Sequence, residues 1–121
     1  ICSYLGAWVY SVERIAHFVE NAYQTLERLG YISRIQLKHD DGTKGWAEHA
    51  PYRGILVTAA SPGVPEDLIA QLAEGGKIVI PVGTRFSQML KVVTKREGKL
   101  TQEDICLCMF VPLIGKNAFK E

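Results

Sequence analysis

The chain has 121 residues, enough for one domain with a hydrophobic core. Hydrophobic residues make up 47% of it and charged residues 22%, close to the averages for soluble globular proteins. A formal net charge of +1 gives no electrostatic reason to expect nucleic acid or a membrane surface as partner, and no apolar run is long enough to span a bilayer.

The cysteines and histidines lack the spacing of a metal site. Cys106 and Cys108 are two residues apart, which places both on one face of a strand, where they act as small apolar groups. The histidines are too scattered for a metal motif; they are His17, His39 and His49. We therefore expect no metal, and this use of cysteine fits a reducing cytoplasm.

The first third of the chain predicts a strand, a helix and a second strand. Residues 1–8 indicate the end of a helix and a turn, and residues 9–13 form a short strand that ends in an acid. Apolar residues recur at helical spacing over 15–29, and Gly30 suits a left-handed helix cap. Residues 35–39 alternate between apolar and polar, which predicts a strand with one wetter face.

The middle of the chain predicts strands that are buried on both faces. Residues 40–46 form a turn-rich loop, and 55–60 are an apolar run of the kind that parallel, doubly wound sheets require. A helix is expected from Pro65 through Leu72, ended by Gly75-Gly76. Residues 77–83 follow as another buried strand.

The last third predicts an antiparallel pair. Residues 88–94 and 105–111 have strand patterns, and the polar link 95–104 contains Gly98 and no helix. The order is therefore β-α-β-loop-β-α-β-β-β. We expect a single α/β domain with a doubly wound, mostly parallel sheet that ends in an antiparallel strand pair.

Three loops follow the carboxyl ends of successive strands, where open α/β sheets bind ligands. Glu13 ends the first strand, and an acid in that place can accept both hydroxyls of a ribose. Asp41 can accept a hydrogen bond from an exocyclic amine, and Gly42 lets backbone approach a base, although an ordinary turn also explains this pair. The small residues 58–62 form the third loop, so the three loops together suit a nucleoside.

Five segments carry a resemblance to a known family. VYSVERI, DGTKGW, APY with ILVTAASP, IAQLAEGGKIVIPVG and FVPLIG have the order and spacing seen in protein-L-isoaspartate O-methyltransferases, from about Leu5 to Gly115. The resemblance implies a Rossmann-like fold and methyl transfer from S-adenosylmethionine (SAM) to the α-carboxylate of L-isoaspartyl residues in damaged proteins. The ester then collapses to a succinimide, which hydrolyses partly back to aspartate.

The resemblance also implies roles for individual residues. Glu13 would hold the ribose hydroxyls of SAM, while Asp41 and Gly42 would contact its adenine. The other implied positions line the cleft near the methyl group: Thr58 and Ile114 with the cofactor, and Ala59, Ala60 and Pro62 with the substrate peptide. No catalytic side chain is identifiable, and none is required, because a carboxylate acceptor is already ionised at neutral pH.

The sequence departs from the family pattern at its start. Twelve residues precede Glu13, whereas a Gly-rich cofactor loop lies about 20 residues before the ribose acid. We therefore expect a carboxyl-terminal part of one methyltransferase domain, without the first strand, the Gly-rich loop or the upstream catalytic segment. In the order 3-2-1-4-5 the first strand is central, so residues 9–13 and 55–60 would each have an unpaired edge. The fragment would then be poorly stable, or would close the gap by a new strand pairing or by an exchange between chains.

Two side chains also differ from the family pattern, and two other functions are open. Arg53 stands where the family usually has Asp, and Asp40 where it usually has Gly. The chain could be an inactive remnant or interaction module. It could also be a nicotinamide-dependent oxidoreductase, which the terminal strand pair and DGTKGW disfavour. The expected partners are isoaspartyl proteins and peptides, in the cytoplasm.

Overall fold

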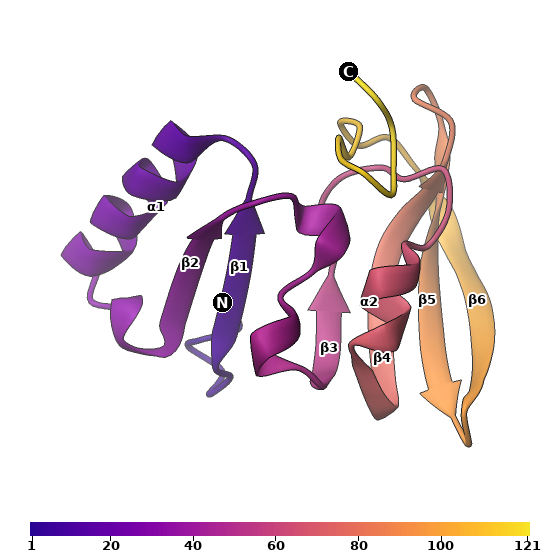
Figure 1. Ribbon diagram of the computed structural model, residues 1–121, viewed down its shortest axis with the longest axis horizontal. Helices are drawn as coiled ribbons and strands as arrows, with labels where there is room; N and C mark the ends of the chain where they lie inside the picture. Colours follow the sequence, from indigo (N-terminus) through magenta and orange to yellow (C-terminus); the bar gives the residue numbers. More distant parts are fainter. The chain divides into compact units, whose positions relative to one another are not determined.

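The computed structural model describes all 121 residues, and these form two compact units, Ile1–Gly42 and Thr43–Glu121. Unit 1 is a parallel strand pair with one helix. β1 (Val9–Glu13) pairs with β2 (Ile35–His39), and α1 (Ala16–Arg28) connects them along one face (Figure 1). A 3-10 turn, η1 (Ile32–Arg34), precedes β2. The predicted strand, helix and strand are confirmed here.

The end of α1 confirms the predicted glycine cap. Gly30 has φ +79°, its N–H donates to the Glu27 carbonyl at 3.0 Å, and the Tyr31 N–H donates to the Leu26 carbonyl at 2.9 Å. These two bonds form a Schellman motif, which satisfies carbonyls left open by the last turn. Glycine adopts this backbone without the steric cost that a side chain would add.

The residues before β1 form hydrogen-bonded turns rather than the end of a regular helix. The Leu5, Gly6 and Ala7 N–H groups each donate to a carbonyl three to five residues back, at 3.0 Å. The side chains of Trp8 and Tyr4 in this stretch are largely exposed. The predicted turn is therefore present before β1, whereas the predicted end of a helix is not.

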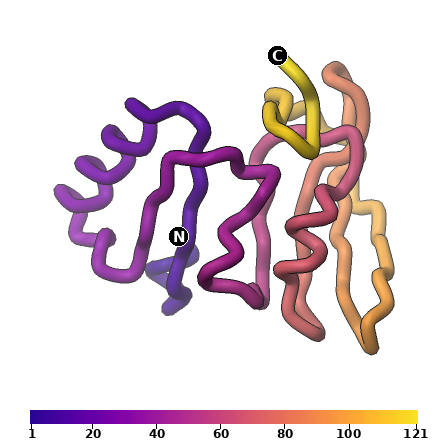
Figure 2. The backbone as a smooth tube through the Cα atoms, in the orientation of Figure 1, coloured from indigo at the N-terminus to yellow at the C-terminus, as the bar shows by residue number.

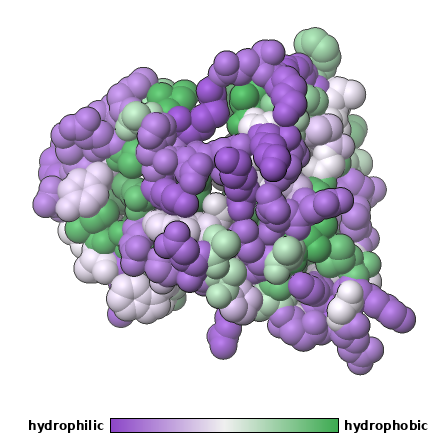
Figure 3. Space-filling model, in the orientation of Figure 1, coloured by the Kyte–Doolittle hydropathy of each residue, from purple (hydrophilic) through white to green (hydrophobic).

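Unit 1 contains no fully buried residue. Large apolar side chains of α1 remain about half exposed, including Phe18 at 48% and Tyr23 at 47%. Figure 3 shows apolar groups (green) among the polar surface on the side where α1 lies. Unit 1 therefore has little core of its own, and two strands with one helix bury too little apolar surface to be stable alone.

Unit 2 is a four-stranded sheet in the order β3-β4-β5-β6. β3 (Tyr52–Leu56) runs parallel to β4 (Leu72–Gly83), whereas β5 (Gln88–Arg96) and β6 (Lys99–Cys108) continue antiparallel. This arrangement confirms the expected parallel sheet with an antiparallel end. α2 (Glu66–Ala70) lies over β4 (Figure 1). The 3-10 turns η2 (Gly42–Lys44) and η3 (Ala47–His49) shape the loop before β3.

The core of unit 2 lies between α2 and the sheet. Its buried members are Leu68, Leu72, Ile78, Ile80 and Val93. Ile78 and Val93 face each other across the β4–β5 ladder, and Ile80 is two residues further along the same face. Burial of each such side chain stabilises the fold by about 1.5–3 kcal/mol.

Several predicted boundaries in the middle of the chain are wrong. The strand predicted at 55–60 is β3, which starts at Tyr52, because its ladder with β4 begins at the Tyr52–Leu72 pair, and which ends at Leu56. The strand predicted to start at 77 is β4, which starts at Leu72. The helix predicted through Leu72 ends at Ala70, because Leu72 already belongs to β4. Gly75-Gly76, predicted as a helix stop, lies inside that strand.

The hairpin is longer and tighter than predicted. The expected link 95–104 is mostly ladder, since Arg96 pairs with Lys99 and only Glu97-Gly98 form the turn. Its polar residues lie on the exposed edge strand β6, where ladder bonds to β5 require no apolar side chains. β6 ends at Cys108 instead of residue 111.

The strands β1 and β3 each have one ladder neighbour. β1 pairs with β2 and β3 pairs with β4, in two separate sheets. One edge of each strand therefore has no strand beside it in its sheet, which agrees with the edges expected from the strand order. Unpaired edges of this kind attract further strands.

The hairpin turn offers a test of local strain. Glu97 has φ +53°, a region in which a side chain costs about 1–2 kcal/mol and Asn is better tolerated. The Glu74 carboxylate accepts the Glu97 and Gly98 N–H groups, which a substitution at 97 would keep. We expect Glu97→Asn to raise the free energy of unfolding by about 0.5–1 kcal/mol in urea denaturation. Glu103→Asn, in the exposed middle of β6, should give no such gain, and equal effects of both would contradict the assignment.

Candidate functional site

Glu13 is oriented by a hydrogen bond to the start of α1. Its Oε1 accepts the Ile15 N–H at 2.8 Å, and its carbonyl accepts the Asp40 N–H at 3.1 Å. The first bond satisfies an N–H that the first turn of the helix leaves open. The other carboxylate oxygen makes no hydrogen bond to the protein. The side chain is therefore fixed in direction while half of its acceptor capacity stays available.

The loop after β2 is shaped by Asp40. Its Oδ1 accepts the Asp41 N–H at 2.7 Å, and its Oδ2 lies 3.0 Å from the Lys38 Nζ. Asp40 thus helps to shape the turn that leads into Asp41. Asp41 and Gly42 are both partly exposed.

Three of the predicted cofactor residues lie at one end of the same strand pair. Glu13 is the last residue of β1 and pairs in register with His39, the last residue of β2. Asp41 and Gly42 follow at once, so all three residues come at the carboxyl end of the parallel pair, where α/β folds place their ligands. Their roles toward a ligand stay predictions.

In unit 2, Ala60 joins two segments through its main chain. Its N–H donates to the Val111 carbonyl and its carbonyl accepts the Leu113 N–H, both at 2.7 Å. The residue is fully buried, so its methyl group is inaccessible. Around it, Ala59 is half-buried, while Thr58 and Pro62 are exposed.

We call residues 110–119 the crossing segment, because the chain leaves the edge strand β6 and returns to the loop after β3. Figure 2 shows this C-terminal segment (yellow) folding back beside that loop. Ile114 lies in it, half-buried, with the Phe119 N–H donating to the Leu113 carbonyl at 3.0 Å and the Gly115 N–H to the Phe119 carbonyl at 3.2 Å. The predicted residues of the 58–62 loop and Ile114 are thus brought together by main-chain bonds.

A polar network that the sequence did not indicate holds the crossing segment. Thr43 is fully buried, and its Oγ1 accepts the Asn117 N–H at 3.2 Å. The Asn117 Nδ2 donates to the Thr43 carbonyl at 3.4 Å and to Asp67 Oδ2 at 2.7 Å. The network links the DGTKGW loop, the crossing segment and the start of α2. Thr43 lies in a recognisable motif, but no pattern marks Asn117.

The rest of the DGTKGW loop is held by Gln71, which follows α2. Its Oε1 accepts the Trp46 N–H at 2.9 Å, and its Nε2 donates to the Lys44 carbonyl at 2.8 Å. Gly45 has φ +64°, and a side chain there would collide with the Gln71 amide. A side chain at position 45 would therefore strain the backbone and displace the Gln71 amide from the loop that it holds.

The remaining sequence candidates are not assembled into a further centre. No group of three or more His, Cys, Asp and Glu side chains is placed to hold a metal. Cys106 is exposed, and the Cys108 Sγ lies 3.6 Å from the Gln88 carbonyl. No helix has the length and apolar character needed to cross a membrane.

Residues 4–118 match the family model for protein-L-isoaspartate(D-aspartate) O-methyltransferase (PCMT). The chain belongs to the PCMT family. This membership confirms the resemblance seen in the five sequence segments. The PCMT match covers both units, and so includes every predicted site residue.

Curated relatives support the PCMT assignment at high identity. A protein-L-isoaspartate O-methyltransferase of Hyperthermus butylicus is 47% identical over 114 residues, which are 93% of this chain and 47% of the relative. One of Staphylothermus marinus is 53% identical over 116 residues, 93% of this chain and 51% of the relative. The chain thus spans about half the length of the curated relatives that it matches.

Solved structures confirm the PCMT fold. A crystal structure of a Plasmodium falciparum PCMT in complex with S-adenosyl-L-homocysteine is similar with a TM-score of 0.76 and 26% identity, over 88% of this chain and 52% of that one. Another protein-L-isoaspartate O-methyltransferase gives a TM-score of 0.79 and 31% identity, over 90% and 34% of the two chains.

The Thr43–Asn117 contact can be tested with an isosteric change. Thr43→Val keeps the shape but leaves the Asn117 N–H without its acceptor, so we expect a loss of about 1–3 kcal/mol in the free energy of unfolding. Hydrogen exchange at the Asn117 amide should become faster. Thr101→Val, on the exposed strand β6, is the control and should change neither quantity. Unchanged exchange at Asn117 would contradict the network.

Proposed function

We propose that this protein transfers a methyl group from SAM to the α-carboxylate of L-isoaspartyl residues in damaged proteins. The observation that carries the proposal is the PCMT match over residues 4–118, which includes an acid at the carboxyl end of β1. The chain would act as the carboxyl-terminal part of a single methyltransferase domain. This activity is the one that the name of the PCMT family describes.

Glu13 would hold the ribose of SAM. Its free carboxylate oxygen can accept a hydroxyl hydrogen bond, while the bond from the Ile15 N–H keeps the side chain in place. An acid fixed in direction by one oxygen loses little rotamer entropy when the other binds a ligand. This geometry supports the proposed role of Glu13 in holding the ribose of SAM.

Asp41 and Gly42 would contact the adenine. A Cβ added at Gly42 would lie 3.9 Å from the Val12 carbonyl, an ordinary contact, and no positive φ requires glycine there. Neither the space around Gly42 nor its backbone conformation explains why glycine stands there. Close approach of the flat adenine ring to the backbone would explain it. Asp41 would accept a hydrogen bond from the exocyclic amine.

The 58–62 loop and the crossing segment would receive the substrate peptide. Thr58 and Ile114 would lie toward the cofactor, and Ala59, Ala60 and Pro62 toward the peptide. Because the main chain of Ala60 is fully used by the crossing segment, its contribution would be to hold that segment. Main-chain groups of the loop other than those of Ala60 would then be available to contact the peptide.

The reaction would depend on orientation. SAM, when bound, supplies an electrophilic methyl group, and the acceptor carboxylate is ionised at neutral pH. The residues of this chain would align the acceptor and exclude water, and such positioning contributes on the order of 7–11 kcal/mol to a transfer step. No acid or base is needed, which is consistent with a site built from main-chain groups and small side chains.

The partners would be isoaspartyl-containing proteins and peptides, met in the cytoplasm. The free edges of β1 and β3 also make strand exchange between two copies a part of the proposal. Size-exclusion chromatography with light scattering would show a dimer at micromolar concentration. A monomer at all concentrations would remove strand exchange without affecting the methyl transfer.

The proposed activity predicts a choice between two peptide isomers. The protein as expressed from its gene should transfer tritiated methyl from SAM to an isoaspartyl peptide, and not to the same peptide with a normal aspartyl residue. Equal labelling of both would refute isoaspartyl recognition. Binding of NAD without S-adenosylhomocysteine would favour an oxidoreductase, and binding of neither would favour an interaction module.

The ribose role predicts the effect of one substitution. Glu13→Gln keeps an oxygen for the Ile15 N–H but removes the charge, so we expect S-adenosylhomocysteine to bind about 10- to 150-fold more weakly in isothermal titration. Glu20→Gln, at an exposed position of α1, is the matched control. Equal affinity of the Glu13→Gln variant and the wild type would exclude Glu13 from the cofactor site.

A further inference from the structure

Gln88 is a buried polar residue with both ends of its amide in use. It is 1% exposed and opens β5. Its Nε2 donates to the Thr84 carbonyl at 2.6 Å, and its Oε1 accepts the Phe110 N–H at 2.8 Å. A buried amide satisfied on both sides is restricted to one orientation and fixes its partners relative to one another.

The Phe110 N–H is the point at which the crossing segment leaves the sheet. The β5–β6 ladder ends at the Gln88–Cys108 pair, and the Gln88 side chain adds one more bond beyond it. The next residue, Val111, gives its carbonyl to the Ala60 N–H at 2.7 Å. Gln88 therefore sets the start of the stretch that reaches the 58–62 loop.

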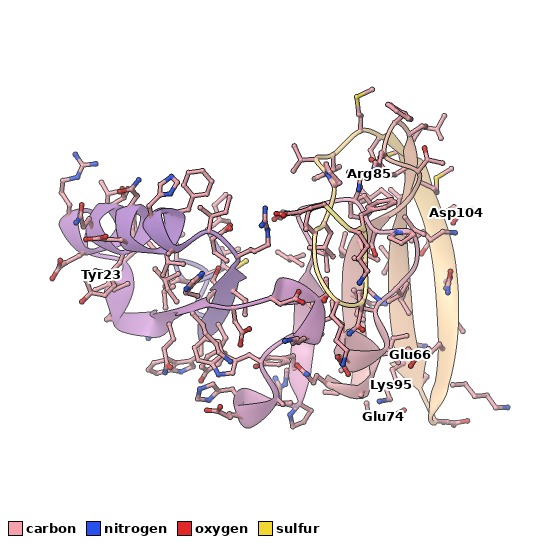
Figure 4. All side chains as sticks on the ribbon, turned by 45° about the horizontal axis from the view of Figure 1, so that its top comes forward. Tyr23, Glu66, Glu74, Arg85, Lys95 and Asp104 are labelled. Carbon is pink, nitrogen blue, oxygen red and sulfur yellow. The ribbon has the colours of Figure 1, made fainter.

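The turn before Gln88 also holds the other end of the crossing segment. Arg85 lies 5.0 Å above the Phe119 ring and donates to the Lys120 carbonyl. Figure 4 shows Arg85 beside the C-terminal segment. Thr84 stiffens this turn, since its Oγ1 accepts the N–H groups of Phe86 and Ser87, both at 3.2 Å. One rigid turn thus contacts both ends of the crossing segment.

We infer that Gln88 is a positioning residue that sets the crossing segment against the 58–62 loop and thereby controls binding of the isoaspartyl peptide. The inference rests on the proposed function. Gln88 touches neither ligand in this account and acts through Phe110 and Val111. Its removal should affect the peptide more than the cofactor, because three of the five proposed cofactor residues, Glu13, Asp41 and Gly42, belong to other loops, and only Thr58 and Ile114 lie in the segments that Gln88 positions.

The test compares Gln88→Met with Gln102→Met, an exposed glutamine of β6. Steady-state kinetics with the isoaspartyl peptide, titration with S-adenosylhomocysteine and thermal melting are measured for both. We expect Gln88→Met to raise the KM for the peptide about tenfold, as small misplacements in a site do, with less than about a twofold change in the Kd of S-adenosylhomocysteine. Gln102→Met should leave all three unchanged. A lower Tm with an unchanged KM for the peptide would overturn the inference.

A second variant keeps the inference testable if Gln88→Met does not fold. Arg85→Met removes the charge above Phe119 at an exposed position, and Arg96→Met, at the exposed end of β5, is its control. Arg85→Met should also raise the KM for the peptide, and an unchanged KM would contradict the role of the turn. A wild type without methyl transfer would refute the proposed function instead. In that case, faster hydrogen exchange at Phe110 and Leu113 in Arg85→Met would still support the positioning role, and unchanged exchange would refute it.

Discussion

The two hydrogen bonds of Ala60 to the crossing segment are the contacts on which the candidate site of unit 2 depends. Both are 2.7 Å long and Ala60 is fully buried, so losing either would leave a buried main-chain group of Ala60 unpaired at a cost of about 1–3 kcal/mol. The Gln88 amide fixes the segment before them and the Thr43–Asn117 pair fixes it after them. The 58–62 loop and the crossing segment are therefore one hydrogen-bonded body.

Unit 1 holds its candidate residues in place by a different kind of contact. It lacks a buried core, yet its parallel ladder brings the ends of β1 and β2 together, and the Ile15 N–H holds Glu13 in one direction. A preoriented carboxylate needs no packed surroundings to act as an acceptor. Both units thus hold their candidate residues in place through directed hydrogen bonds.

Local sequence patterns made part of the fold predictable. The β1-α1-β2 order followed from apolar spacing and from Gly30, whose left-handed backbone is a property of the residue itself. The start of β6 did not, because its polar residues are held by ladder bonds to β5 that leave no mark in the side-chain pattern. Gln88 could have been suspected as a polar residue in a buried strand. The partner of Thr43, 74 positions away, could not, since long-range pairing has no local signal.

The central claim is that the 58–62 loop and the crossing segment act as one peptide-binding body. Hydrogen exchange at the amides of Ala60 and Leu113 tests it most directly, measured with S-adenosylhomocysteine and then with an isoaspartyl or an aspartyl peptide added. The account predicts that the isoaspartyl peptide slows exchange at both amides together and that its aspartyl twin slows neither. Protection of one amide alone, or equal protection by both peptides, would contradict it.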